Sequence, residues 1–218
     1  MKKQLLTLAA LLTVTFLNAQ ELKPIELKSP NMERKATMMD AFQKRASSLD
    51  WTAEMLSIQD LSDLLWAGNG INRPQEAKRT APSATNAQEV DIYAFFEEGA
   101  YLYNAQANVL EPVAKGDFRA EVIGPRSGSV TSTSQPPVLL ILVADISRFT
   151  RVQDEERRLK MAAMDAGIVS QNIAIFCAGA NMVTRPRAMM NMEKIKEVLK
   201  LSDTQHPLLN NPVGYAKK

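Results

Sequence analysis

Four segments of the chain repeat their apolar residues with the spacing of an α-helix. The pattern predicts helices over residues 33–45, from Ser57 as N-cap to the turn at 68–70, over residues 155–180, and after Asn191 as N-cap. The third helix is the longest, and its second half is apolar on most faces. Such a helix has to be buried, either in the domain core or in a subunit interface.

Strand patterns gather in the middle of the chain. Residues 91–96 and 100–103 are predicted to form a hairpin, with residues 109–113 as a third strand. The continuous apolar run 138–144 is typical of a strand buried on both faces. Because the strands cluster and helices flank them, we expect an α+β domain with a mostly antiparallel central sheet.

The remaining segments are predicted as connections. Residues 21–33 and 207–218 each contain two prolines and are expected to be extended. Residues 73–87 are expected to form a polar loop. Residues 127–137, rich in Ser, Thr and Pro, are expected to form a mobile loop or lid.

The first twenty residues have the organisation of a secretory signal peptide. Lys2 and Lys3 precede an apolar run, residues 5–17, which is too short to span a bilayer comfortably, and Asn18-Ala19-Gln20 supplies a cleavage site. We therefore expect a periplasmic or secreted protein whose single domain covers residues 21–218. The alternative is an uncleaved N-terminal anchor.

Charge excludes some classes of partner. Removing residues 1–20 takes away two of the 26 basic residues and none of the 24 acidic ones, so 24 face 24 and the mature chain is neutral. A neutral chain gives no electrostatic case for binding nucleic acid or an anionic membrane. No second apolar run is long enough to cross a bilayer.

Cysteine and histidine are equally restrictive, because the chain has one of each. Cys177 lies in an apolar helical run and is interpreted as a buried, inert thiol, which leaves no internal disulfide. His206, before Pro207, is interpreted as a surface residue. No group of His, Cys and carboxylates has metal-ligand spacing, so no metal is expected.

A polar loop over residues 79–88 lies between a helical and a strand pattern. Its hydroxyl, amide and backbone groups suit a flat, heteroatom-rich ring such as a flavin. With residues 41–48 upstream and 213–218 at the C-terminus, the loop resembles the FMN-dependent nitroreductase superfamily, especially its thiazole/thiazoline-oxidase (SagB-type dehydrogenase)-like branch. Residues 61–73 and Asp165-Ala166-Gly167 with Gln171-Asn172 match further motifs in the same order.

The resemblance implies a nitroreductase-like fold that forms a homodimer with two FMN sites at its interface. Hydride would pass through the bound flavin in a ping-pong cycle, with a small-molecule donor and a small-molecule acceptor. The flavin does the chemistry, so no catalytic side chain is expected.

The resemblance also implies roles for individual residues. Arg45 and Ser47 match the residues that hold the FMN phosphate, and Lys217 and Lys218 match the basic residues that close this site. Residues that match the loop facing the ring, or the segment passing its reactive face, are Pro82, Ser83, Asn86, Thr184 and Arg185. Taken singly, Arg45 reads equally well as an exposed helix end, Asn86 as a turn former and the lysines as a solvated terminus.

Four positions depart from the family pattern. Ala46 replaces a second arginine, Leu49 a basic residue, and Thr85 a common glycine. Pro186 stands where a glycine is usual and has no N–H, so it cannot donate a hydrogen bond to the flavin N5. Arg185 or Thr184 would have to supply that donor.

The combined prediction is an exported FMN-dependent oxidoreductase. Nicotinamide cofactors are cytoplasmic and no Gly-x-Gly-x-x-Gly motif is present, so a different hydride donor, with oxygen or a quinone as acceptor, is one solution. The alternative is a binding protein that keeps the fold but has little or no turnover. A plain secreted structural domain is the third reading. No residue pattern defines the substrate, the donor or the acceptor.

Overall fold

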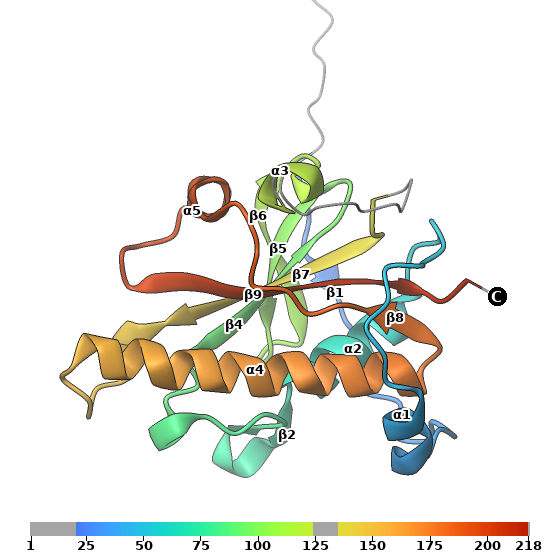
Figure 1. The fold of residues 1–218 in the computed structure, drawn as a ribbon, viewed down its shortest axis with the longest axis horizontal. Helices are drawn as coiled ribbons and strands as arrows, with labels where there is room; N and C mark the ends of the chain where they lie inside the picture. Colours follow the sequence, from blue (N-terminus) through green and yellow to red (C-terminus); the bar gives the residue numbers. More distant parts are fainter. Residues whose placement is uncertain (1–20, 124–134, 218) are drawn as a thin grey trace, which may run out of the picture.

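A seven-stranded sheet forms the centre of the domain in the computed structural model, which describes residues 21–123 and 135–217 (Figure 1). Its strand order is β1-β6-β5-β4-β7-β9-β8, and every neighbouring pair is antiparallel. The predicted α+β class with a mostly antiparallel sheet is confirmed. The strands are β1 (Ile25–Glu26), β4 (Val90–Phe95), β5 (Gly99–Asn104), β6 (Val109–Lys115), β7 (Val138–Asp145), β8 (Met182–Thr184) and β9 (Gln205–Tyr215).

Strand β7 is the centre of the core. Every residue from 138 to 144 is fully buried, as its apolar run predicted. Alternate side chains enter two separate clusters: Leu140 and Leu142 one, Leu139 and Ile141 the other. This is the alternation of side chains that a pleated strand requires, with both of its faces covered.

Helices cover the two faces of the sheet (Figure 1). On one face lie α2 (Ile58–Asn69) and α4 (Glu155–Gly179), and α1 (Met38–Lys44) packs against the C-terminal end of α4. On the other face lie α5 (Met192–Leu199) and the short α3 (Arg119–Ile123), which the sequence did not predict. The N-caps predicted for α2 and α5 are confirmed, because Ser57 and Asn191 accept backbone N–H groups.

The burial of α4 is only partly as predicted. Val169 and Ile173 face the sheet and are buried, but Met164 is 55% exposed and Ile168 is 36% exposed. By length and apolar composition α4 would also qualify as a membrane span. Its packing against α1, α2 and the sheet identifies it as a core helix with one side left open.

Several boundaries were wrong for local reasons. Helix α1 begins at Met38 rather than at residue 33, because Thr37 and Asp40 form a capping box that starts the helix there. The predicted polar loop 73–87 contains a small hairpin of β2 (Ile71–Arg73) and β3 (Lys78–Arg79) and two 3-10 turns, Pro74–Glu76 and Ala84–Asn86. The tail from residue 207 is extended as predicted, and most of it forms part of β9.

The two single-copy residues differ in outcome. Cys177 is buried as predicted, and burial raises the pKa of its thiol, which makes it unreactive. His206 is not a free surface residue, because it pairs with Ala144 within the sheet and its Nε2 is buried with no hydrogen-bond partner among the described residues. Burial lowers the pKa of His206. The predicted signal peptide, residues 127–134 of the predicted lid, and Lys218 lie outside the described residues.

Candidate functional site

Three segments distant in sequence meet near the C-terminal end of α4. Ser47 forms a parallel bridge with Thr184 at the end of β8, and the N–H of Ser48 donates to the Thr184 carbonyl at 3.0 Å. Trp51 forms an antiparallel bridge with Ala216. The segment after α1 therefore covers the open edge of the sheet beyond β8, which satisfies backbone groups that an edge strand otherwise leaves unpaired.

Gly214 makes this arrangement possible. Trp51 is 2% exposed and lies directly on the backbone of β9. A Cβ at position 214 would lie 2.6 Å from the Trp51 Cβ, a separation that ordinary packing does not allow. The glycine is thus needed for the close approach of Trp51 to the backbone of β9, and it sets how closely residues 45–52 pack against the C-terminal strand.

The meeting of these segments concentrates positive charge. The bridge between Ser47 and Thr184 brings the backbone near Arg45 close to that near Arg185, and both arginines are exposed. Within the described part of the chain neither arginine forms an ion pair. Exposed guanidinium groups on segments that meet at Ser47 suit a phosphate or carboxylate ligand.

Other predicted members of this cluster are placed less favourably. The Lys217 Nζ lies 2.9 Å from an Asp50 carboxylate oxygen, so its charge already has a counter-ion. Both side chains are exposed, and such a surface ion pair is weak. Ala46 is exposed and contributes no charge. Thr184 is buried, and its hydroxyl accepts a long hydrogen bond from the Asn211 amide at 3.5 Å.

Arg187 belongs to the same region and was missed in the sequence. Its Nε donates to Asn210 Oδ1 at 3.2 Å, and burial, followed by the charge of Arg185, lowers the pKa of Arg187. No carboxylate pairs with it in the described ranges 21–123 and 135–217. The spacing Arg185-Pro186-Arg187 was the available signal, since alternate residues of an extended segment share a face.

The predicted ring-facing loop lies elsewhere in the protomer. The N–H of Ala84 donates to Asp165 Oδ2 at 2.7 Å, which ties the loop to the first half of α4. The loop is closed by the N–H of Gln88, which donates to Ser83 Oγ at 2.9 Å. Pro82 and Asn86 are exposed. Along the helix axis, Asp165 lies roughly 21 Å from Gly179, where the basic segments gather, so one protomer does not bring the two sets together.

Backbone strain is concentrated in the same loop. Thr85, Asn86 and Gln88 have φ values of 55°, 56° and 50°, all in the left-handed region. Asparagine tolerates this conformation, but a β-branched threonine is an outlier there. The structure thus gives a physical reason why a glycine would suit position 85.

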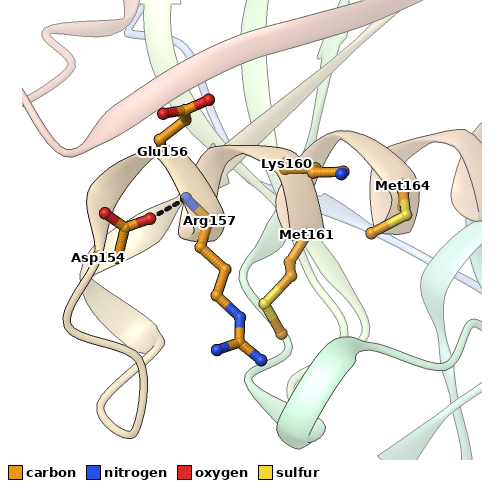
Figure 2. Close-up of a pocket in the computed structure, with 6 residues that line it drawn as sticks. All are labelled: Asp154, Glu156, Arg157, Lys160, Met161 and Met164. Atoms are coloured by element: carbon orange, nitrogen blue, oxygen red, sulfur yellow. Dashed lines mark hydrogen bonds between the residues drawn. The ribbon is translucent and has the colours of Figure 1, made fainter.

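A surface hollow of about 530 Å³ lies along the first turns of α4 (Figure 2). All its lining residues come from this helix and its N-cap: Asp154, Glu156, Arg157, Lys160, Met161 and Met164. None of the basic residues Arg45, Arg185, Arg187 and Lys217, and no residue of the ring-facing loop, lines it. The hollow is therefore separate from both parts of the candidate site.

In the described part of the chain no group of three or more His, Cys, Asp or Glu could hold a metal ion.

A central antiparallel sheet with helices on both faces defines an α+β domain, and its candidate site residues are divided between a basic end and a strained polar loop. Residues 43–215 match the model of the nitroreductase family. The chain belongs to the nitroreductase family.

Solved structures give the same fold. The chain is similar to a candidate nitroreductase from Ralstonia eutropha JMP134, at 27% identity and a TM-score of 0.80, over 89% of this chain and 90% of that one. It is also similar to a chain of the Escherichia coli microcin synthetase McbBCD complex, at 17% identity and a TM-score of 0.70, over 99% and 85%. It is similar as well to Bacillus megaterium NfrA2, at 18% identity and a TM-score of 0.61, over 83% of this chain and 67% of that one. No curated protein matches the chain.

Strain at Thr85 can be tested by substitution. Glycine should relieve a left-handed penalty of roughly 1–2 kcal/mol, offset by about 0.5–1 kcal/mol of extra chain entropy. We expect Thr85→Gly to raise the free energy of unfolding by about 0.5–1 kcal/mol in urea denaturation, while Thr85→Ala gives no such gain. Equal effects of the two substitutions would contradict a strained backbone.

Proposed function

We propose that this protein is an oxidoreductase that works through a bound flavin mononucleotide. The observation that carries the proposal is the meeting of residues 45–48, 184–187 and 214–217, which brings together segments with two exposed arginines, Arg45 and Arg185, that form no ion pair within the described residues. An exposed pair of arginines stabilises a bound anion because it brings charge and paired N–H donors to one place. Membership of the nitroreductase family makes the FMN phosphate the anion of choice.

The donor set fits a phosphate at this end. Arg45 would hold the phosphate oxygens, the Ser47 hydroxyl would add a hydrogen bond, and Arg185 would contribute on the opposite side. The losses of charge at Ala46 and Leu49 are partly offset by Arg187, which stands near Arg185 and has no carboxylate partner among the described residues. Lys217 would strengthen the site only after leaving Asp50.

Residues around the ring would orient it rather than react. Bound FMN supplies hydride transfer in two half-reactions, one with a donor and one with an acceptor. Asn86 and Ser83 would present amide and hydroxyl groups to the polar edge of the ring. Pro186 has no N–H to offer N5, so the backbone of Arg185, the preceding exposed residue, would be the donor there.

The role of Arg45 can be measured directly. Losing one charge-assisted contact costs about 1.5–3 kcal/mol, which weakens binding roughly 10- to 150-fold. We expect Arg45→Ala to raise the FMN dissociation constant by this factor in a fluorescence titration. Arg151→Ala, which removes another exposed arginine from the loop before α4, should leave it unchanged. Unaltered flavin affinity in Arg45→Ala would remove Arg45 from the site.

We also propose that the working form is a homodimer. Asp165, which holds the ring-facing loop, and the basic segments beyond Gly179 lie about 21 Å apart along α4 in one protomer. A second copy related by a two-fold axis beside α4 would let the loop of one protomer meet the basic segments of the other. Each complete site would then need both chains.

Exposed apolar side chains support this arrangement. Met164 and Ile168 project from the open side of α4, and the neighbouring α1 exposes 74% of Met39 and 53% of Phe42. Large side chains gathered on adjacent helices in this way are unusual on a monomer surface and mark interfaces. The hollow in Figure 2, whose lining includes Met161 and Met164 of α4, would be covered by the same partner.

Met164→Glu tests the dimer. A buried charge facing a second copy without a partner opposes association, so we expect the variant to sediment as a monomer where the wild type sediments as a dimer. Met192→Glu is the matched control, because Met192 is 40% exposed on α5, across the sheet. A dimer in both variants would place the interface elsewhere, and a monomeric wild type would overturn the proposal.

Export is the final part of the proposed function. Residues 1–20 would direct the chain out of the cytoplasm, and nicotinamide cofactors are absent outside it. The reductant would then be another hydride donor, with oxygen or a quinone as oxidant. N-terminal sequencing of protein isolated from the periplasm or medium should begin within residues 20–21. A cytoplasmic protein that keeps residues 1–20 would contradict export.

A further inference from the structure

Two buried carboxyl groups lie in contact where the ring-facing loop joins the sheet. Glu89 ends the loop and is 0% exposed, and Asp165 of α4 is 6% exposed. Both Glu89 carboxyl oxygens are buried, and in the described part of the chain no N–H or O–H of another residue donates to them; the backbone of Glu89 itself lies near them and favours the ionised form. The Asp165 carboxyl lies close enough to raise the pKa of Glu89, both through a side-chain contact and through its charge. Two ionised carboxylates cannot share such a contact away from water, so one of them must carry a proton.

The hydrogen bonds indicate which one. Asp165 Oδ2 accepts the N–H of Ala84 at 2.7 Å, which requires a free lone pair on Asp165. The contact of the Glu89 carboxyl with its own backbone favours the ionised form less than burial opposes it. All these groups are satisfied when Glu89 carries the proton and donates a hydrogen bond to Asp165. Asp165 then accepts hydrogen bonds from both Glu89 and the Ala84 N–H.

Surrounding charges do not neutralise Glu89. The cation that influences it is Arg148, from the 3-10 turn at 146–148, but this guanidinium is already paired with both oxygens of Asp91. Asp145 of β7 donates its N–H to the Glu89 carbonyl, and its carboxylate is held by Ser147 and Thr204. On α4, Arg158 donates instead to the Ile146 carbonyl at 3.5 Å.

We propose that Glu89 is a positioning residue that stays protonated at neutral pH and, through its hydrogen bond to Asp165, keeps the Ala84 N–H and with it the 82–88 loop fixed against α4. Protonation follows from the contacts of this chain alone. Only the consequence for flavin rests on the proposed function, because it assumes that the loop faces the ring.

The pH dependence has a definite sign. Burial, and further the contact with Asp165, raise the pKa of Glu89 from its ordinary 4.5 to about 8. The folded state therefore holds a proton that the unfolded chain releases. The stability it gives is fully present below pH 4.5, falls as the pH rises, and is lost above about 8. Above that pH two carboxylates would face each other and the loop would separate from α4.

Glu89→Gln separates this proposal from a purely structural role. Its amide has nearly the same shape and still donates to Asp165, but it does not titrate. In the full-length mature protein labelled with ¹³C-glutamate, infrared spectra at pH 7 should contain the carbonyl band of a protonated carboxylic acid. This band should disappear in Glu89→Gln and remain in Glu97→Gln, a control at an exposed turn. Absence of the band in wild type would overturn the proposal.

Two profiles test positioning. Relative to Glu89→Gln, the unfolding equilibrium constant of wild type should rise by up to tenfold per pH unit between pH 5 and 8. Amide exchange at Ala84 should accelerate above pH 8 beyond its intrinsic rate in wild type but not in Glu89→Gln. Parallel profiles in the two proteins would overturn the proposal. Should Glu89→Gln not fold, loss of the wild-type infrared band with a midpoint near pH 8 remains decisive.

Neither readout requires flavin, so a protein that never binds FMN would defeat the proposed function and leave the Glu89 test intact. If FMN does bind, its dissociation constant should rise above pH 8 in wild type and stay level in Glu89→Gln. A level profile in wild type, with the infrared band present, would show that the protonated pair does not position the ring-facing loop, and would overturn that part of the proposal.

Discussion

The packing of α4 against the sheet is the constraint on which both parts of the site depend. Burial of Val169, Ile173 and their neighbours against β4, β7 and β9 fixes the helix in place. Each large apolar side chain contributes about 1.5–3 kcal/mol when fully buried. Because α4 is held rigidly, Asp165 presents a fixed acceptor to the ring-facing loop. At the C-terminal end of α4, β8 and the segment after α1 meet in a fixed position. If α4 could slide along the sheet, neither the ring-facing loop nor this basic end would be held in place.

Periodicity predicted the parts of the fold that the core determines. Local sequence patterns of burial and capping were sufficient to predict the strand at 138–144, the helix over 155–179 and the N-caps at Ser57 and Asn191. The hairpin of β2 and β3 was missed because its strands have three and two residues, too few to show a period. Helix α3 was missed for the same reason, having five residues.

The motifs proposed candidate site residues, but they did not predict how these residues are arranged. The order of motifs indicated Arg45, Ser47 and Arg185, and the structure brings the backbones near them together through the bridge between Ser47 and Thr184. Sequence gave no indication that Asp50 would pair with Lys217, or that Glu89 would lie against Asp165, since these contacts depend on tertiary packing. The left-handed backbone at Thr85 was equally hidden, because threonine does not favour it.

Whether the basic cluster and the loop hold FMN is the central question. The most direct measurement is the visible absorption spectrum of residues 21–218, purified from cells with ample flavin, with mass identification of any released ligand. We predict a yellow protein that releases one FMN per chain on denaturation. A colourless protein that also fails to take up added FMN would contradict it, and would mean that this member of the family keeps the fold without the cofactor.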